Sequence, residues 1–422
     1  MQPPRTPSWQ LFADSPPRGD YVALSFWNRT TEVEWAVQML LDESARQQQM
    51  LWAAHGQTRS GKSHLVHRIL LDERLTAAGF RSVVVMANNR GTAHAAIVEI
   101  FRTLWKEVSA LRANPAVGLD DETVAQFRAR FAQIEQTLDG AYELQSMHAE
   151  ASGRAGAVGF TLGERAVSGL TGELKAQQEQ RNEQRETLRA PSDEQLVRAI
   201  QGGLGLLVRA NRGRPVTLVI DDIDLLDRAA REGGPESDKL FDLLRPLAEV
   251  PQVIPIVVTR NLFFSGRQKD LLDFVSVLPM SDVDLGEIYK LRLAHFHDGA
   301  PVFDEDAANF LVANANGLVG MFLRYCFEIY RAHHQTLPIT FDMVQGHLRR
   351  QLQEWRNSSD ALPLVNKAVQ AIRARELEIE TDLDPAGAGL LHRLLYYVPG
   401  QRTRYAISGL YAGLLAELAA RG

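Results

Sequence analysis

The chain has 422 residues, of which 45% are hydrophobic and 23% charged, and its formal net charge is -6. This length accommodates two or three domains, and the composition is typical of a globular protein with a sizeable core. The negative charge excludes a basic field over the whole molecule that would attract nucleic acid, so only a local basic patch could bind it.

The cysteine content and hydropathy predict where the protein resides. Its one cysteine, Cys326, cannot form an intrachain disulfide, which is typical of a reducing cytoplasm. The N-terminus lacks the apolar segment of a signal peptide, and no apolar run approaches the roughly 20 residues of a membrane-spanning helix. We therefore expect a cytoplasmic protein without a membrane segment.

The first predicted elements precede the main motif. Residues up to about Asp20 are rich in Pro, Ser and Gly and predict an irregular arm. The next stretch predicts a helix from about Thr30 to Ala45, with Thr30 or Thr31 as N-cap and acidic residues in the first turn.

The segment Gly56–Ser63 reads G-x-x-x-x-G-K-S, the phosphate-binding P-loop pattern. A short apolar run before it predicts a buried strand, and the residues after it have helical spacing. At such a helix N-terminus, free N–H groups and the helix dipole favour phosphate, whereas the alternative is a glycine turn with a solvated lysine. Lys62 would reach the β- and γ-phosphates and Ser63 would bind Mg²⁺. The predicted contacts are Gly56, Gln57, Thr58, Arg59, Ser60, Gly61, Lys62, Ser63 and His64.

The chain then continues the predicted sheet. Residues 81–88 predict a buried strand and residues 92–111 a helix, so the order strand, loop, helix and strand implies a parallel sheet. Residues 114–190 interrupt it with charged amphipathic helical patterns and two Gly-rich stretches that could pair as a hairpin or form a flexible connection. We interpret this segment as an insertion. The alternative is a protrusion that contacts a partner or nucleic acid.

A second motif lies at Val216–Asp224, where an all-apolar strand ends in acidic residues in the Walker B pattern. Because ligands of open parallel sheets bind at the carboxyl ends of the strands, these carboxylates are expected to face the P-loop. Asp221 would hold Mg²⁺, and Asp222 would orient the attacking water as general base. Asp222 is shorter than the usual glutamate, which puts the hydrolysis rate in doubt. The alternative is an acidic turn at the end of a strand.

Together these motifs resemble initiator-type AAA+ ATPases of the origin-recognition kind and the related STAND ATPases, such as NB-ARC proteins. Phe26, Arg29 and the acidic run Glu32–Glu34 are similar to the F-x-G-R-x-x-E-L box of these families, with Asn28 in place of glycine. The resemblance implies that Arg29 lies on the base side of the nucleotide. It also favours ATP with Mg²⁺ as the cofactors, and no N-K-x-D guanine-reading motif follows the Walker B strand.

The resemblance extends to the residues that would sense the γ-phosphate. The predicted strand Val253–Asn261, which ends in polar residues, stands at the sensor 1 position. Arg260 is therefore the first candidate reader and Asn261 the second, unless Arg260 pairs with a nearby aspartate. Arg267, in the next loop, is the candidate arginine finger toward a neighbouring subunit. The glycine turn at residues 316–320 lacks the sensor 2 arginine, and Arg324 is only a weak substitute.

The C-terminal region is predicted to be mostly helical. A helix over residues 386–397, a turn, a strand at Arg404–Ile407 and a last helix from Leu410 resemble a winged helix. Basic and acidic residues nearly balance there, so no phosphate-binding face is evident.

We therefore predict an α/β fold with an AAA+-like P-loop sheet, an α-helical lid and a helical, winged-helix-like C-terminal domain. The expected boundaries are 1–20 for the arm, 21–280 for the ATPase core, 281–337 for the lid and 338–422 for the C-terminal domain.

Three functions follow from this interpretation. The first is an ATP-hydrolysing switch, of the defence, signalling or transposition type, that assembles with copies of itself or with partner proteins. The alternative is a DNA-binding initiator or loader, and the third is an NTP-binding scaffold with negligible hydrolysis.

Overall fold

The structure of the protein is a computed structural model. The structure describes residues 12, 28–57, 59–87, 92–112, 116, 119–155, 191–221, 223, 226, 236–259, 271–385, 387–391, 393–398 and 403–421. These residues form two compact units. One comprises residues 1–80, 221–224 and 256–422, and the other comprises residues 81–220 and 225–255.

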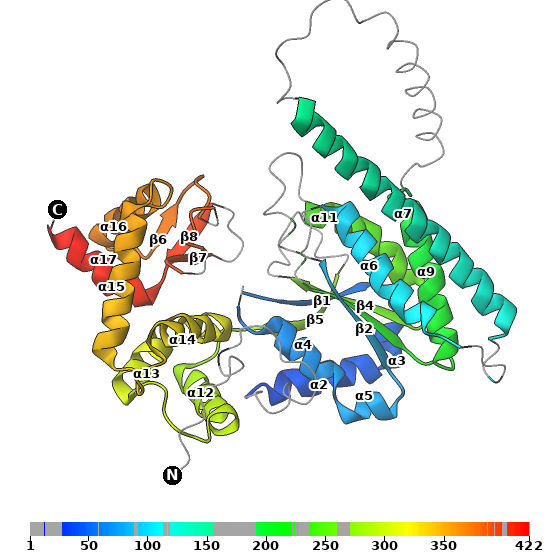
Figure 1. Cartoon of the computed structure of the whole chain (residues 1–422). Helices are drawn as coiled ribbons and strands as arrows, with labels where there is room; N and C mark the ends of the chain where they lie inside the picture. Colours follow the sequence, from blue (N-terminus) through cyan, green and yellow to red (C-terminus); the bar gives the residue numbers. More distant parts are fainter. Residues whose placement is uncertain are drawn as a thin grey trace, which may run out of the picture. The chain divides into compact units, whose positions relative to one another are not determined.

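The main sheet has the strand order β2-β3-β4-β1-β5 (Figure 1). Its central strand β1 runs parallel to both of its neighbours, β4 and β5. The parallel α/β fold predicted from the sequence is therefore confirmed. The strands are β1 Leu51–Gly56, β2 Arg81–Met86, β3 Val216–Asp221, β4 Val253–Thr259 and β5 Leu271–Val277.

β3 and β4 are buried along their whole length, as expected of runs of apolar, largely β-branched residues in the middle of a sheet. In the first unit, the N-terminal helices pack on β1, on β5 and on one another. These are α2 Thr30–Leu41, α3 Glu43–Arg46, α4 Lys62–Leu70 and α5 Glu73–Ala77.

The predicted helix from Thr30 to Ala45 is two helices, and its predicted threonine cap is wrong. Arg29 occupies the N-cap position of α2, and no side chain caps the helix there. The helix ends at Leu41 because Asp42 adopts an extended backbone and accepts a hydrogen bond from the Ser44 amide, which begins α3.

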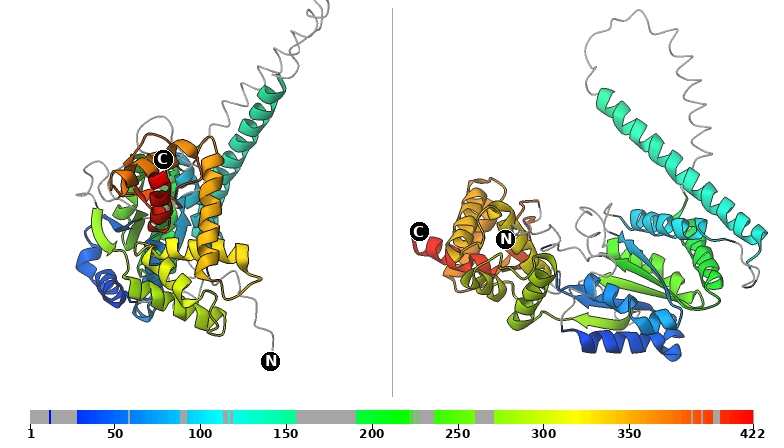
Figure 2. Two further views of the ribbon diagram at one scale, coloured as in Figure 1. Left: turned by 90° about the vertical axis from the view of Figure 1, so that its left-hand side faces the viewer. Right: turned by 60° about the horizontal axis from the view of Figure 1, so that its bottom comes forward.

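The second unit contains a helical layer beside β2. Figures 1 and 2 show the long helix α7 beside α6, and α9 also packs on α6. Phe131 of α7 stacks on Phe101 of α6 with ring centroids 4.9 Å apart. The helices are α6 Ala93–Ser109, α7 Asp121–Ala155, α9 Asp193–Ala210, α11 Glu236–Leu244 and the 3-10 helix η5 Arg245–Glu249. Residues 151–155, expected in a Gly-rich connection, belong to α7, and the remainder of that connection lies outside the described residues.

After β5 the chain is largely helical, as predicted. The lid helices are α12 Asp282–Phe296, α13 Glu305–Ala313 and α14 Val319–His333. The C-terminal helices are α15 Phe341–Asn357, α16 Leu362–Arg373 and α17 Gly409–Arg421. One continuous core connects the two groups, and it includes Leu285 of α12, Phe322 of α14 and Leu415 of α17.

A small antiparallel sheet of order β6-β8-β7 lies among the C-terminal helices (Figure 1). Its strands are β6 Glu378–Glu380, β7 Leu395–Tyr397 and β8 Arg404–Ile407. The predicted helix over residues 386–397 is wrong, because Leu395–Tyr397 pair with β8 and the described residues between β6 and β7 form turns. A short apolar run has no period that separates a helix from buried turns and a strand.

None of the helices that the structure describes combines the length and the hydropathy that a membrane crossing requires.

Candidate nucleotide-binding site

The P-loop lies between β1 and α4, where the motif predicts it. β1 ends at Gly56, and α4 begins at Lys62. Gly61 is the N-cap of α4 in a left-handed conformation (φ 92°), and as a glycine it has no side chain to cap the helix. The first-turn amides and the positive end of the α4 dipole are thus at the loop, which is the arrangement that favours phosphate. Thr58 lies outside the described residues.

Gly56 is required by a close approach between the loop and the end of β5. A Cβ atom at this position would lie 2.3 Å from the carbonyl oxygen of Val277. Gly56 and Val277 are also register partners in the parallel pair β1–β5. The first glycine of the motif therefore lets the chain leave the sheet directly into the loop.

Lys62 and Ser60 are folded into the loop itself. The Lys62 ammonium donates to the carbonyl oxygen of Gln57 at 2.9 Å, and the Ser60 amide donates to the same carbonyl at 3.2 Å. Lys62 is 9% exposed and Ser60 is fully buried. A phosphate in the loop would offer Lys62 an anionic acceptor, which forms stronger hydrogen bonds than a neutral carbonyl.

The oxygen ligands expected for Mg²⁺ come from two elements. Ser63 lies in the first turn of α4, and Asp221 is the last residue of β3 and is 2% exposed. Among the described residues, no group of three or more His, Cys, Asp or Glu could hold a metal ion. A hydroxyl and a carboxylate suit Mg²⁺ at a phosphate site, where phosphate and water supply the remaining ligands. Asp222 lies outside the described residues.

The end of β4 lies beside the start of the P-loop. Thr259, the last residue of β4, is the register partner of His55 and is 1% exposed. The two residues that follow it, Arg260 and Asn261, were predicted to sense the γ-phosphate. They and Arg267 lie outside the described residues, so their roles stay predictions.

Arg29 is bound to the protein's own carbonyl groups. Its guanidinium donates to the carbonyl oxygens of Leu278 at 2.5 Å and Ser60 at 3.5 Å, and to the Glu32 carboxylate at 3.1 Å. It is 4% exposed, and burial lowers its pKa while Glu32 opposes that shift. These contacts connect the N-terminus of α2 to the P-loop and to the segment after β5. The expected contact with the base side of a nucleotide stays a prediction.

The lid contacts the P-loop through residues that the motifs did not assign to this role. Gly320, in the first turn of α14, exchanges two hydrogen bonds with Arg59 of the loop. The signal in the sequence was the glycine turn at residues 316–320. In the families that the motifs resemble, this turn carries an arginine of the lid. Here the arginine of the contact is Arg59, which belongs to the loop.

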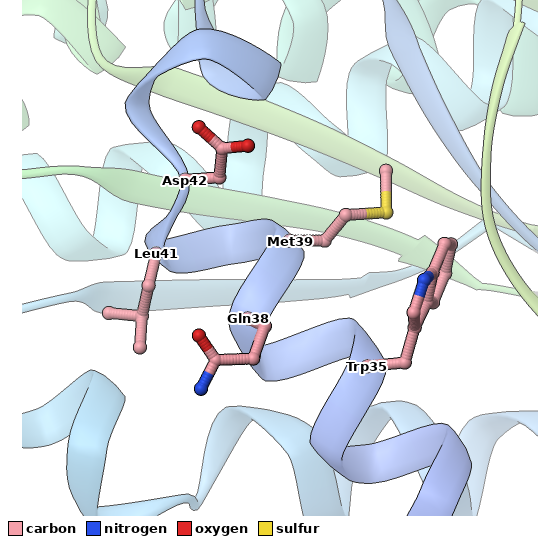
Figure 3. Close-up of a pocket in the computed structure, with 5 residues that line it drawn as sticks. All are labelled: Trp35, Gln38, Met39, Leu41 and Asp42. Atoms are coloured by element: carbon pink, nitrogen blue, oxygen red, sulfur yellow. The ribbon is translucent and has the colours of Figure 1, made fainter.

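A surface cavity of about 440 Å³ lies on α2 and is separate from the predicted nucleotide contacts (Figure 3). Trp35 and Met39 project from the same helix toward it, and Trp35 is 49% exposed. The lining residues are Trp35, Gln38, Met39, Leu41 and Asp42.

No family model and no curated protein sequence matches the chain. Among solved structures, it is similar to the Walker-type ATPase PABY2304 of Pyrococcus abyssi, with 14% identity, a TM-score of 0.44 and coverage of 96% of this chain and 99% of that one. The ORC1 protein of Aeropyrum pernix, solved in complex with DNA, is 16% identical with a TM-score of 0.44. The match covers 98% of this chain and 87% of that one. The ORC2 protein of the same organism, in ADPNP-ADP complexes, is 10% identical with a TM-score of 0.46. The match covers 98% of this chain and 96% of that one.

Two of these neighbours are named ORC proteins, and the third is a Walker-type ATPase.

Proposed function

We propose that the protein binds and hydrolyses ATP with Mg²⁺ and acts as a nucleotide-dependent switch. The observation that carries this proposal is the P-loop between β1 and α4, with Lys62 folded against the Gln57 carbonyl and the first turn of the lid helix α14 hydrogen-bonded to the same loop. Phosphates that enter the loop would accept hydrogen bonds from its amides and from Lys62. The lid would change its position with the loop, because α14 is hydrogen-bonded to it. The choice of ATP over other nucleotides follows from the family resemblance.

In this proposal each predicted residue has a separate role. Lys62 neutralises the β- and γ-phosphates, while Ser63 and Asp221 hold Mg²⁺. Asp222 orients the attacking water, and Arg260, or else Asn261, senses the γ-phosphate. Arg267 would act across an interface with a second copy, so assembly with itself or with partner proteins belongs to the proposal.

The first test is nucleotide binding. We expect the wild type to bind ATP in equilibrium dialysis and Lys62→Ala to lose at least about tenfold in affinity, because charge-assisted hydrogen bonds to phosphate are among the strongest. The control Lys106→Ala, in the last turn of α6, should bind like wild type. Equal affinity of Lys62→Ala and wild type would refute the proposed site.

The second test separates a switch from a scaffold. We expect measurable hydrolysis by wild type and a loss of about 100-fold in Asp222→Asn, because general-base catalysis contributes on this scale. Molecular mass should be measured by light scattering with ATP, with ADP and without nucleotide. Equal, near-zero turnover in wild type and variant would favour the NTP-binding scaffold instead.

A DNA-binding initiator or loader is the second candidate function. It is favoured by the small antiparallel sheet among helices α15, α16 and α17, which resembles a winged helix, and ORC1 of Aeropyrum pernix was solved in complex with DNA. A helix-turn-helix reader needs a second helix for the major groove, yet the described residues between β6 and β7 form turns. Binding of duplex DNA at two salt concentrations tests it, because phosphate contacts give affinity that falls steeply with salt.

A further inference from the structure

The first turn of α14 and the P-loop are joined by a reciprocal pair of hydrogen bonds. The Gly320 amide donates to the Arg59 carbonyl oxygen at 2.9 Å, and the Arg59 guanidinium donates to the Gly320 carbonyl oxygen at 3.2 Å. One residue of the loop is thus held through its backbone and its side chain by one residue of the lid.

The contact leaves little room for a side chain at the lid position, so a methyl group there would require the loop or the lid to shift by a few tenths of an ångström. A Cβ atom on Gly320 would lie 3.0 Å from the Arg59 Cβ and 3.3 Å from the Arg59 carbonyl oxygen. Beside it, Val319 lies 3.1 Å from the position of a Cβ on Gly61. Two successive residues of α14 therefore touch the loop directly, and a side chain at position 320 would strain this contact.

The lid helix depends on the loop for its cap. Its N-cap residue is Leu318, whose apolar side chain makes no capping hydrogen bond. The first amides of a helix need acceptors from outside it, and Arg59 supplies one to Gly320. A change in the loop at Arg59 is therefore also a change in the order of the first turn of α14.

Arg59 has a left-handed backbone conformation, with φ at 66°. This region is unfavourable for a residue with a long side chain, and glycine would adopt it freely. An arginine at such a position is explained if its side chain has a task that glycine could not perform. The described contact with the Gly320 carbonyl is such a task.

We propose that Arg59 is a positioning residue that ties the lid to the phosphate-binding loop, so that the two rearrange together when nucleotide enters. This inference rests on the proposed function for its nucleotide part. The Arg59–Gly320 contact itself is present in the protein without nucleotide. It gives the lid a connection to the phosphates although the turn at residues 316–320 lacks the usual arginine.

Other contacts keep the lid attached when this tie is broken. Asn28 donates to the Asp284 carboxylate at 2.6 Å, and the Met280 amide donates to the Gly317 carbonyl at 2.8 Å. Arg29 holds Leu278 in the segment that leads into α12. Loss of the Arg59 side chain should therefore loosen the first turn of α14 without unfolding the lid.

The test compares variants that separate backbone from side chain. Arg59→Gly removes the guanidinium and relieves the backbone, Arg59→Lys retains a cation that can donate, and Gly320→Ala introduces the close contact. Arg331→Ala is the matched control, because Arg331 is an exposed arginine farther along the same helix.

Hydrogen exchange of the nucleotide-free proteins is the first readout. We expect amides in the first turn of α14 to exchange about tenfold faster in Arg59→Gly and in Gly320→Ala, as the loss of one charge-assisted hydrogen bond would give. Arg59→Lys should be intermediate, and Arg331→Ala and the second half of α14 should match wild type. If the amides in the first turn of α14 exchange at the wild-type rate in Arg59→Gly, the proposed tie is wrong.

ATP affinity is the second readout, and the double variant Arg59→Gly/Gly320→Ala measures coupling. We expect each single variant to weaken ATP binding about tenfold and the double variant to lose little more, because both break one contact. Faster exchange with unchanged ATP affinity would overturn the coupling of the tie to nucleotide. If the wild type binds no ATP, the proposed function fails, whereas the exchange result still decides whether the tie exists.

Discussion

Arg29 shows at the scale of a single residue how burial limits what a motif position can do. A guanidinium that is 4% exposed needs acceptors, and this one finds the Leu278 and Ser60 carbonyls and the Glu32 carboxylate. A contact with a nucleotide base would compete with these bonds. Arg29 thus supports the P-loop and the segment that leads into α12.

Two histidines on neighbouring helices are expected to make the stability of the C-terminal half sensitive to acid. The rings of His333 and His347 are 6.0 Å apart, and Arg350 approaches His333 at 3.4 Å. Burial first, and the cation of Arg350 second, lower the pKa of His333. Burial, His333 and Arg350 lower the pKa of His347, while Glu328 and Glu354 act in the opposite direction.

The free energy of unfolding depends on pH because the folded and unfolded chains bind protons differently. Folding lowers the pKa values of both histidines. As the pH falls below about 6.5, the unfolded chain therefore binds more protons than the folded chain. The free energy of unfolding should therefore decrease between pH 7.5 and 5.5. We expect this decrease to be smaller in His347→Gln than in wild type, measured by urea denaturation. The control His334→Gln, at an exposed position, should keep the wild-type decrease, and an unchanged decrease in His347→Gln would contradict the assignment.

At the scale of elements, the predicted N-terminal arm contributes to the lid core. Phe12 is 3% exposed and contacts Phe303 and Tyr330, with ring centroids 5.9 and 5.8 Å away. We expect Phe12→Ala to lower the free energy of unfolding by about 3 kcal/mol, because a large buried side chain leaves a cavity. Urea denaturation measures this, and Leu377→Ala, at a residue 63% exposed, should change it by less than about 0.5 kcal/mol. Equal effects of the two substitutions would show that Phe12 adds no stability.

At the scale of the whole molecule, the P-loop and the lid belong to the same compact unit. A ligand that binds only the folded state stabilises it, by about 2.7 kcal/mol at 100 times its Kd. ATP with Mg²⁺ should therefore raise the melting temperature of wild type in a thermal shift experiment and leave that of Lys62→Ala unchanged. An equal rise in both proteins would place the bound nucleotide elsewhere.

The sequence by itself determined the sheet and the position of the loop. Runs of largely β-branched residues that end at Asp221 and Thr259 favour buried strands, and G-x-x-x-x-G-K-S specifies a turn into a helix. These are local patterns, so they can be read without knowing their neighbours.

Only the tertiary structure decided what touches the loop. The carbonyls that hold Arg29, the Val277 oxygen that requires Gly56, and the pairing of Arg59 with Gly320 join residues far apart in the chain. The same holds for β7, whose residues gave no clear period and became a strand by pairing with β8. The P-loop could be read from the sequence, whereas the lid contact that would make it a switch depends on which backbone groups come within hydrogen-bonding distance.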